Sequence, residues 1–298
     1  MNAIEVRNVT YETRNFSLHD VSFDVPQGYV TGFIGANGVG KTTMIRLIMN
    51  VLQQKSGEIT INGKRMSDHP IALKSEIGFV YSDLYLKDTW QIGKCEDMIA
   101  PFYKKWDTSQ FTKYLKRFGL QRTMKIKELS TGMKMKLSLA IAFSHHASIF
   151  ILDEPTSGLD PIARHEVLEM IQDELIDANR TVFFSTHITP DLEKIADHIV
   201  YLHQGNVIFN DDMDTLRSQF KMVQGDVSHL DDELRSLLIA PKETSTRYIG
   251  LTEHADVFHE LFGNAVVISE AQIEDMMVHI EKGSKGDAVI GASRGERL

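Results

Sequence analysis

The sequence predicts an α/β protein with a mostly parallel core sheet, and three observations lead to that class. An apolar run at residues 29–34 meets a glycine-rich turn and then a segment with helical spacing at 44–52. Three later apolar runs alternate with helical stretches, an order typical of a parallel sheet flanked by helices. These runs are residues 149–152, 181–185 and 199–202. Near the N-terminus, residues 4–6 and 21–25 alternate apolar and polar side chains, which predicts an antiparallel β region.

Length and composition agree with a globular protein. The 298 residues allow about two domains of ~150 residues each. Hydrophobic residues make up 42% and charged residues 24%, close to the globular average. The apolar runs are far shorter than the ~20 residues of a membrane-spanning helix, and the N-terminus predicts no signal peptide. Cys95 is the only cysteine, which excludes internal disulfides and cysteine metal clusters and favours a reducing cytoplasm.

The acidic charge is concentrated in the last quarter of the chain. Residues 222–298 contain 14 acidic and 7 basic side chains, a net −7 out of the total of −9. Nucleic-acid binding depends on clustered lysine and arginine side chains that neutralise phosphates. An acidic extension on a nearly neutral body therefore predicts no nucleic-acid partner.

Changes in composition along the chain indicate further parts. Aromatic, methionine and lysine residues dominate residues 84–135, which predicts an inserted helical subdomain containing a helix capped by Asp107. Residues 222–282 predict a small α+β C-terminal extension, with a strand at 247–251 and a helix from Ser269. The last stretch, 283–298, has four glycines and little apolar content and predicts a flexible tail.

Residues 35–43 read Gly-Ala-Asn-Gly-Val-Gly-Lys-Thr-Thr and fit the phosphate-loop pattern G-x-x-x-x-G-K-[ST]. In such a loop, backbone N–H groups surround the phosphates, the lysine supplies a positive charge, and the hydroxyl after it binds Mg²⁺. The same pattern should occur by chance in roughly one of a hundred sequences of this length. In that case the segment would be only a glycine turn before a helix. The flanking strand and helix favour nucleotide binding by Gly35, Asn37, Gly38, Gly40, Lys41, Thr42 and Thr43.

Two acids follow the apolar run that ends at Leu152. An Asp-Glu pair after a strand is usually an ordinary polar turn. Beside a phosphate loop, Asp153 is instead predicted to hold Mg²⁺ together with Thr42, and Glu154 to act as the base for an attacking water. Ligands of open α/β sheets bind at the carboxyl ends of the strands, where these acids stand. The sequence thus predicts a nucleotide hydrolase.

Three further segments in fixed order resemble the motifs of ABC-type ATPases. Residues 129–133 (Leu-Ser-Thr-Gly-Met) resemble the signature motif, 157–161 (Ser-Gly-Leu-Asp-Pro) the D-loop, and 185–187 (Ser-Thr-His) the switch histidine. Tyr11 stands where that family places an aromatic residue on adenine. The resemblance covers about residues 2–220. It implies a P-loop NTPase of the ABC cassette fold over residues 1–221, with ATP and Mg²⁺ as cofactors.

The resemblance also implies a mechanism. Two cassettes, in a homodimer or a heterodimer, would pack head to tail with ATP between the phosphate loop of one and the signature segment of the other. Ser130 and Gly132 open a helix whose positive end suits a γ-phosphate. Asp160 would lie near the nucleotide as part of the D-loop, and His187 would contact the γ-phosphate and position water with Glu154.

Within the family, the chain resembles cassettes of ABC-2-type bacterial exporters of the bacitracin-resistance and YtrB-like group. Residues 102–107 (Phe-Tyr-Lys-Lys-Trp-Asp) resemble the F-Y-x-x-W-D element of that group. A further similarity is to staphylococcal cassettes that export amphipathic phenol-soluble modulin peptides. The implied partners are separate transmembrane permease subunits, and the implied location is the cytoplasmic face of the cell membrane.

One position departs from the family pattern. ABC cassettes usually carry a glutamine after an Ile-Gly-aromatic strand, but here residues 77–81 lead to Ser82 and Asp83. A serine is too short to span the same gap, whereas Asp83 could supply an oxygen to Mg²⁺ if the loop shifts by one residue. The alternative is an ordinary solvated acid.

Two other functions compete with an exporter subunit. A soluble ABC ATPase of the translation or repair type would carry two cassettes or a long coiled coil, and neither pattern is present in this sequence. A nucleotide sensor that does not hydrolyse ATP is disfavoured because Glu154 is intact. The sequence does not encode the cargo.

Overall fold

The computed structural model describes residues 1–175 and 180–286. The chain divides into two compact units, and the boundary along the sequence lies between Asn210 and Asp211. The cassette boundary expected at residue 221 coincides with the start of a strand, and that domain assignment stays a prediction. The tail expected from residue 283 begins inside a helix that reaches Gly286. The remainder of that tail, 287–298, lies outside the described residues.

A six-stranded sheet forms the centre of the first unit, in the order β10-β9-β3-β8-β7-β6. Its strands are β3 (Val30–Ile34), β6 (Ile77–Val80), β7 (Ile149–Asp153), β8 (Thr181–Thr186), β9 (His198–His203) and β10 (Asn206–Asp212). The pairs from β9 through β6 are all parallel, so the predicted α/β class with a parallel core is confirmed. Strands β3, β7 and β8 are buried at every residue because both faces of this sheet are covered.

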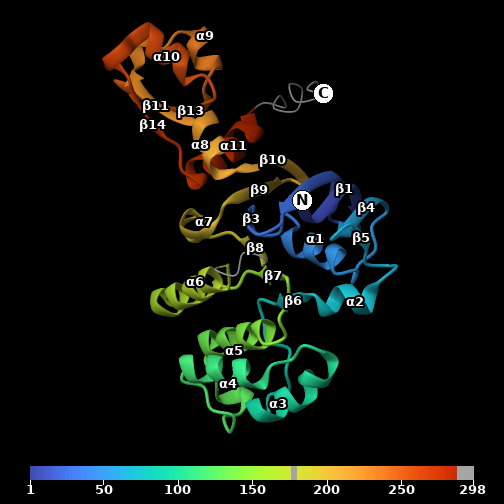
Figure 1. Cartoon of the computed structure of the whole chain (residues 1–298). Coiled ribbons are helices and arrows are strands. Elements are labelled where there is room, and N and C mark those ends of the chain that lie inside the picture. Colours follow the sequence, from blue (N-terminus) through green and yellow to red (C-terminus); the bar gives the residue numbers. More distant parts are fainter. Residues whose placement is uncertain (176–179, 287–298) are drawn as a thin grey trace. The chain divides into compact units, whose positions relative to one another are not determined.

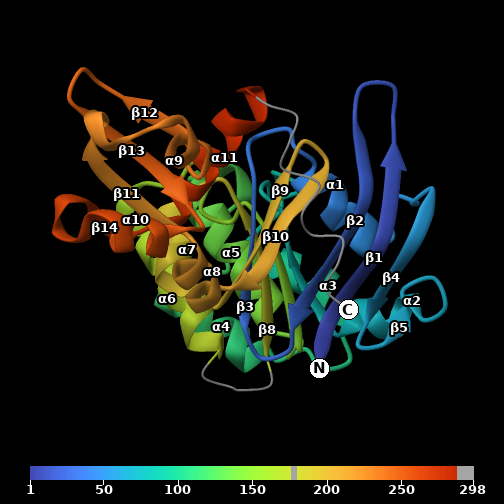
Figure 2. The same cartoon turned by 90° about the horizontal axis from the view of Figure 1, so that it is seen from above.

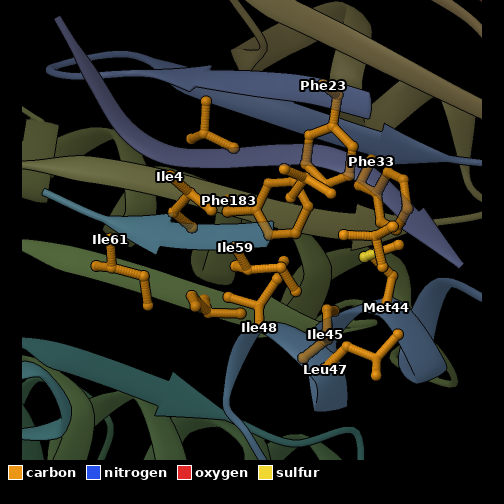
Figure 3. Packing of buried hydrophobic residues seen from close by; sticks show 14 of the residues in the cluster. Ile4, Phe23, Phe33, Met44, Ile45, Leu47, Ile48, Ile59, Ile61 and Phe183 are labelled. Carbon is orange, nitrogen blue, oxygen red and sulfur yellow. The ribbon is translucent and has the colours of Figure 1, made fainter. Parts of the chain in front are cut away.

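A second, antiparallel sheet with the order β2-β1-β4-β5 lies beside it. It consists of β1 (Asn2–Glu12), β2 (Ser17–Pro26), β4 (Ser56–Ile61) and β5 (Lys64–Arg65). Figure 2 shows β1, β2 and β4 side by side. The main hydrophobic core joins both sheets to helix α1 (Lys41–Ile48), and the rings of Phe23, Phe33 and Phe183 stack with centroids 5.2–5.8 Å apart at its centre (Figure 3).

The remaining helices of the first unit include the predicted helical subdomain, 84–135. They are α2 (Pro70–Ser75), α3 (Ile92–Ile99), η1 (Ala100–Phe102), α4 (Thr108–Arg117), η2 (Ile126–Glu128), α5 (Thr131–Phe143), α6 (Pro161–Leu175) and α7 (Thr189–Ile195). Helices α3, α4 and α5 gather at one end of the unit (Figure 1). The two ends of the subdomain are joined by backbone hydrogen bonds, because Ile92 N donates to Met124 O at 3.0 Å and Ile126 N to Trp90 O at 2.9 Å.

Side-chain contacts fix the subdomain internally and to the core. Asp107 caps α4 as predicted, since its Oδ1 accepts hydrogen bonds from the backbone of Ser109 and Gln110 at 2.8 and 2.9 Å. The buried carboxylate of Glu174 on α6 accepts a hydrogen bond from the hydroxyl of Tyr114 on α4 and pairs with Arg180. A polar contact therefore links α4 to the helix that follows β7.

The second unit is an α+β domain around an antiparallel sheet with the order β12-β13-β11-β14. Its elements are α8 (Met213–Gln219), β11 (Lys221–Asp226), η3 (Val227–His229), α9 (Asp232–Ser236), β12 (Ile239–Glu243), β13 (Arg247–Thr252), α10 (Ala255–Phe262), η4 (Gly263–Ala265), β14 (Val267–Glu270) and α11 (Ile273–Gly286). The strand expected at 247–251 is confirmed as β13. The helix expected from Ser269 begins later, because Ser269 pairs with Met222 in β14.

Among the described residues, no helix combines the length and the apolar character needed to cross a bilayer.

Candidate functional site

The phosphate loop connects the carboxyl end of β3 to the first residue of α1. Gly40 has φ +114°, a left-handed conformation, and a Cβ there would clash with the ring of Phe16. Gly38 is also left-handed, with φ +81°. Both positions need glycine for conformational reasons, and Gly40 needs it for space as well. Gly35 and Asn37 precede these turns, and Thr42 and Thr43 lie in the first turn of α1.

The ammonium group of Lys41 lies inside the loop, and only 5% of its side chain is exposed. Its Nζ donates hydrogen bonds to Gly35 O at 2.8 Å and Ala36 O at 3.3 Å. A third contact is an ion pair with Glu154 Oε1 at 3.2 Å. The lysine is thus held next to the loop backbone and to the predicted base.

Asp153 is the last residue of β7, and it is 2% exposed. Its Oδ1 accepts hydrogen bonds from Ser185 Oγ at 2.7 Å and from Thr42 Oγ1 at 3.3 Å. Strands β7 and β8 are neighbours in parallel register, with Asp153 opposite Ser185. The sheet therefore brings three residues that are distant in sequence to one point.

Glu154 connects the lysine to the predicted switch histidine. Its Oε2 lies 2.8 Å from His187 Nδ1, while Oε1 contacts Lys41. The Glu154 backbone has φ +52°, which is uncommon for a residue with a side chain, and its N–H lies 3.1 Å from both the carbonyl oxygen and Oγ of Ser185. This strand end holds the Glu154 side chain against both the phosphate loop and the end of β8.

The donor atoms at this edge fit a magnesium ion. Magnesium is usually bound by one or two carboxylates together with water and substrate phosphates, rather than by a complete protein cage. The Asp153 carboxylate and the Thr42 hydroxyl are oxygen ligands 3.3 Å apart. Among the described residues there is no group of three or more His, Cys, Asp or Glu side chains that could hold a metal.

A cavity of about 450 Å³ lies next to the phosphate loop. Its lining includes Phe16 from the turn between β1 and β2, together with Gly38 and Gly205. Tyr11, the predicted adenine contact, does not line this cavity; it lies in β1 opposite Leu18 and packs against the core. Phe16 is thus the aromatic residue that the structure places at the cavity.

The signature and D-loop residues occupy helix starts. Ser130 caps α5, and its Oγ accepts a hydrogen bond from Met133 N at 3.2 Å, which leaves the hydroxyl proton free to be donated. The Asp160 carboxylate accepts hydrogen bonds from the N–H groups of Ala163 and Ile162, which lower its pKa. No hydrogen bond or ion pair joins these residues, or Gly132, to Lys41 within the described chain.

Ser82 and Asp83 follow β6 and are exposed. In the described part of the chain, Asp83 forms no hydrogen bond or ion pair with Thr42 or Asp153. Its role at Mg²⁺ stays a prediction.

Two residues of this edge were not found from the sequence. Ser185 was visible only as the start of a Ser-Thr-His segment, and its contact with Asp153 depends on the order of the strands. Phe16 could have been suggested by its aromatic character between two strands, since the turn that it occupies returns to the phosphate loop.

The chain was compared with known proteins. The family model described as "ABC transporter" matches residues 18–157. The ATP-binding protein YtrB of Bacillus subtilis is 31% identical over 210 residues, which cover 70% of this chain and 72% of the relative. The bacitracin transport protein BcrA of Bacillus licheniformis is 32% identical (68% and 67% covered), and the lantibiotic transport protein SrtF of Streptococcus pyogenes is 30% identical (66% and 85%).

Solved structures give the same fold. An ATP-binding subunit of an ABC transporter matches with a TM-score of 0.66 and 28% identity, covering 73% of this chain and 92% of the other. The cassette MJ0796, bound to ADP and phosphate as a dimer, matches with a TM-score of 0.62 and 20% identity, covering 70% and 98%. These matches confirm the architecture predicted from the motifs.

Proposed function

Because the chain belongs to the family of ABC transporter ATP-binding proteins and is an ATPase, we propose that it energises an exporter by dimerising on ATP and driving separate permease subunits. The single observation that carries this proposal is the continuous contact from Lys41 through Glu154 to His187 beside the Asp153–Thr42 pair. These are the groups that ATP hydrolysis requires, and they converge at one edge of the sheet.

The contacts suggest an order of events. When the β- and γ-phosphates enter the loop, the Lys41 ammonium exchanges its contacts with Gly35 O, Ala36 O and Glu154 for phosphate oxygens. Oε1 of Glu154 then becomes free to accept a proton from water, while His187 holds Oε2. The resulting hydroxide attacks the γ-phosphorus, and ADP leaves.

Magnesium would be held by Thr42 and Asp153, where it would neutralise the charge that develops on the phosphate oxygens. Ser185 fixes the orientation of the Asp153 carboxylate through a 2.7 Å hydrogen bond. We propose the Phe16 ring, which lines the cavity beside Gly38, as an adenine contact in addition to the Tyr11 ring predicted from the sequence.

The dimer completes the site from outside the chain. Ser130 can donate its hydroxyl proton to the γ-phosphate of ATP bound by the partner cassette, since its Oγ is the acceptor in its hydrogen bond with the Met133 N–H. Gly132 and Asp160 would face the same nucleotide. A homodimer and a heterodimer are both compatible with these contacts.

The relatives support a class of cargo. One is named for bacitracin transport and one for lantibiotic transport. We therefore propose antimicrobial or amphipathic peptides, or similar compounds, as cargo, and the cytoplasmic face of the cell membrane as the location. Co-purification with a membrane protein would support this function, whereas co-purification with RNA or ribosomes would favour a soluble ABC ATPase.

Glu154→Gln tests the site directly. The amide keeps the size and the contact with His187 but cannot accept the proton, so ATP turnover should fall roughly 10²–10⁴-fold while ATP binding is retained. The matched control is Glu58→Gln, which removes an exposed carboxylate paired with Arg65 and should leave turnover unchanged. Normal turnover of Glu154→Gln would reject the assignment.

A further inference from the structure

The helical subdomain is a basic region in an acidic protein. Residues 84–135 contain 11 basic and 5 acidic side chains, a net +6, although the whole chain carries −9. Figure 1 shows helices α3 and α4 of this subdomain at one end of the first unit. At physiological salt, charges more than ~8 Å apart are largely screened from each other. The acidic charge elsewhere therefore does not cancel the field at the surface of the subdomain.

The two arginines of the subdomain are paired, but its lysines are not. Arg117 contacts Asp173 at 2.6 Å, and Arg122 pairs with the buried Glu96. Eight lysines are exposed, and within the described chain none of them forms an ion pair: Lys87, Lys94, Lys104, Lys105, Lys113, Lys116, Lys125 and Lys127.

Most acids of the subdomain are already engaged. Asp107 accepts the backbone N–H groups at the start of α4, and Glu128 Oε2 accepts the N–H of Lys125 at 3.0 Å. Glu96 is buried with Arg122 and the indole N–H of Trp106. Two acids, Asp88 and Asp97, remain exposed, so the eight exposed lysines still leave the surface of the subdomain with a net positive charge.

Two large apolar side chains are exposed among these lysines. Met98 on α3 is 43% exposed, and Phe102 at the end of η1 is 81% exposed. Ile92 and Cys95 on the same helix are fully buried. Lys94 lies one turn before Met98, and Lys104 and Lys105 follow Phe102 directly. The α3–η1 segment thus presents an apolar strip flanked by three lysines and by one exposed acid, Asp97, which directly precedes Met98.

We propose that this strip, formed by Met98, Phe102, Lys94, Lys104 and Lys105, contacts the anionic phospholipid surface of a membrane. Lysine is a compact charge on a flexible stem, which suits attraction to many headgroups rather than a partner of fixed shape. Stable attachment to a membrane surface takes two signals, and the strip supplies both, since the apolar side chains can enter the interface while the ammonium groups remain at the phosphates. None of these residues belongs to the nucleotide site, so the contact does not depend on ATP chemistry.

The test is co-sedimentation of the full chain, without nucleotide, with vesicles that contain phosphatidylglycerol and with vesicles of phosphatidylcholine alone, at about 0.15 M salt. Binding is expected only to the anionic vesicles. The double variant Lys104→Gln, Lys105→Gln should weaken it about 30-fold, from a contribution of about fivefold for each lysine near the surface. Phe102→Ser should weaken it further at unchanged charge.

The matched control is Lys64→Gln, Lys74→Gln, which removes two exposed lysines outside the subdomain. It should bind anionic vesicles like the wild type, and every variant should keep wild-type ATPase activity. Equal losses in both double variants would show an effect of net charge alone and overturn the proposal. Absence of binding to either vesicle would also overturn it and would point to an acidic protein segment as the partner of the strip.

Discussion

Charged side chains are buried at the phosphate-loop edge of the first unit but exposed on the surface of the second unit. At the edge, Lys41 and Asp153 are nearly inaccessible, and every charged group has a specific partner at hydrogen-bond distance. In the second unit, Arg235 reaches Glu243 and Asp232 across an exposed surface. Burial of a charge costs free energy unless close contacts compensate for it, so we attribute the buried charges at the edge to the reaction and not to stability. The ion pairs on the surface of the second unit are exposed and contribute little to stability.

The largest expected effect is on ATP binding. Lys41→Ala removes the ammonium group that we expect to bind the phosphate oxygens of ATP. The variant also removes one of the two contacts of the Glu154 carboxylate. The Kd for ATP should rise about 30-fold or more, as measured by a fluorescent nucleotide titration. Lys55→Ala, which breaks the exposed pair with Glu12, is the control and should leave the Kd within about twofold. Similar Kd values for both variants would show that the buried and the exposed lysine contribute equally to ATP binding.

A buried histidine provides a second large effect, on stability. His145 is 1% exposed, its ring stacks on Tyr103 with centroids 4.0 Å apart, and burial lowers its pKa to about 4. The unfolded chain, with an ordinary value near 6.5, therefore takes up a proton between pH 6.5 and 4 that the folded chain does not. The free energy of unfolding should fall by about 3 kcal/mol over that window as the pH decreases.

His145→Phe keeps an aromatic ring against Tyr103 but cannot titrate, so denaturant unfolding should show a flatter pH dependence between 6.5 and 4. His165→Gln, at an exposed position next to Glu169, is the control and should keep the wild-type slope. An unchanged slope in His145→Phe would mean that the acid sensitivity arises elsewhere.

The contact between β7 and β8 can be tested with a variant whose expected effect on kcat is of intermediate size. Ser185→Ala removes the hydrogen bond to Asp153 Oδ1 and one of the two acceptors of Glu154 N, so the Asp153 carboxylate loses its fixed orientation. The rate constant kcat should fall about tenfold, the value of one hydrogen bond to a charged group. Ser138→Ala removes a hydroxyl that donates to Lys134 O within its own helix and should leave kcat unchanged. If Ser185→Ala were as active as this control, the orientation of Asp153 would have to come from the backbone.

The smallest effect is expected in the second unit. Arg235→Ala breaks the contacts with Glu243 and Asp232, yet the melting temperature should fall by about 2 °C or less because both contacts are exposed to solvent. Differential scanning calorimetry would measure this. A much larger fall would show that these exposed pairs contribute substantially to the stability of the second unit.

The sequence predicts what depends on local spacing. The phosphate loop, the acids after Leu152 and the Asp107 cap are each encoded by neighbouring residues, and their geometry follows from the strand or helix beside them. The contact of Ser185 with Asp153 and the contacts of Glu154 depend on which strands are adjacent, which no local pattern contains. Ser269 illustrates the same limit, since it pairs with Met222, far away in sequence, and so belongs to a strand instead of a helix.

The backbone hydrogen bonds of Trp90 with Ile126 and of Ile92 with Met124 give the helical subdomain a common entrance and exit. When the two ends of a chain segment lie together, the entropic cost of closing the segment rises only slowly as the segment becomes longer. The parallel sheet can therefore accommodate changes of length and sequence between these four residues with little effect on its own folding. The same cassette core could thus be combined with different subdomain surfaces in the course of evolution.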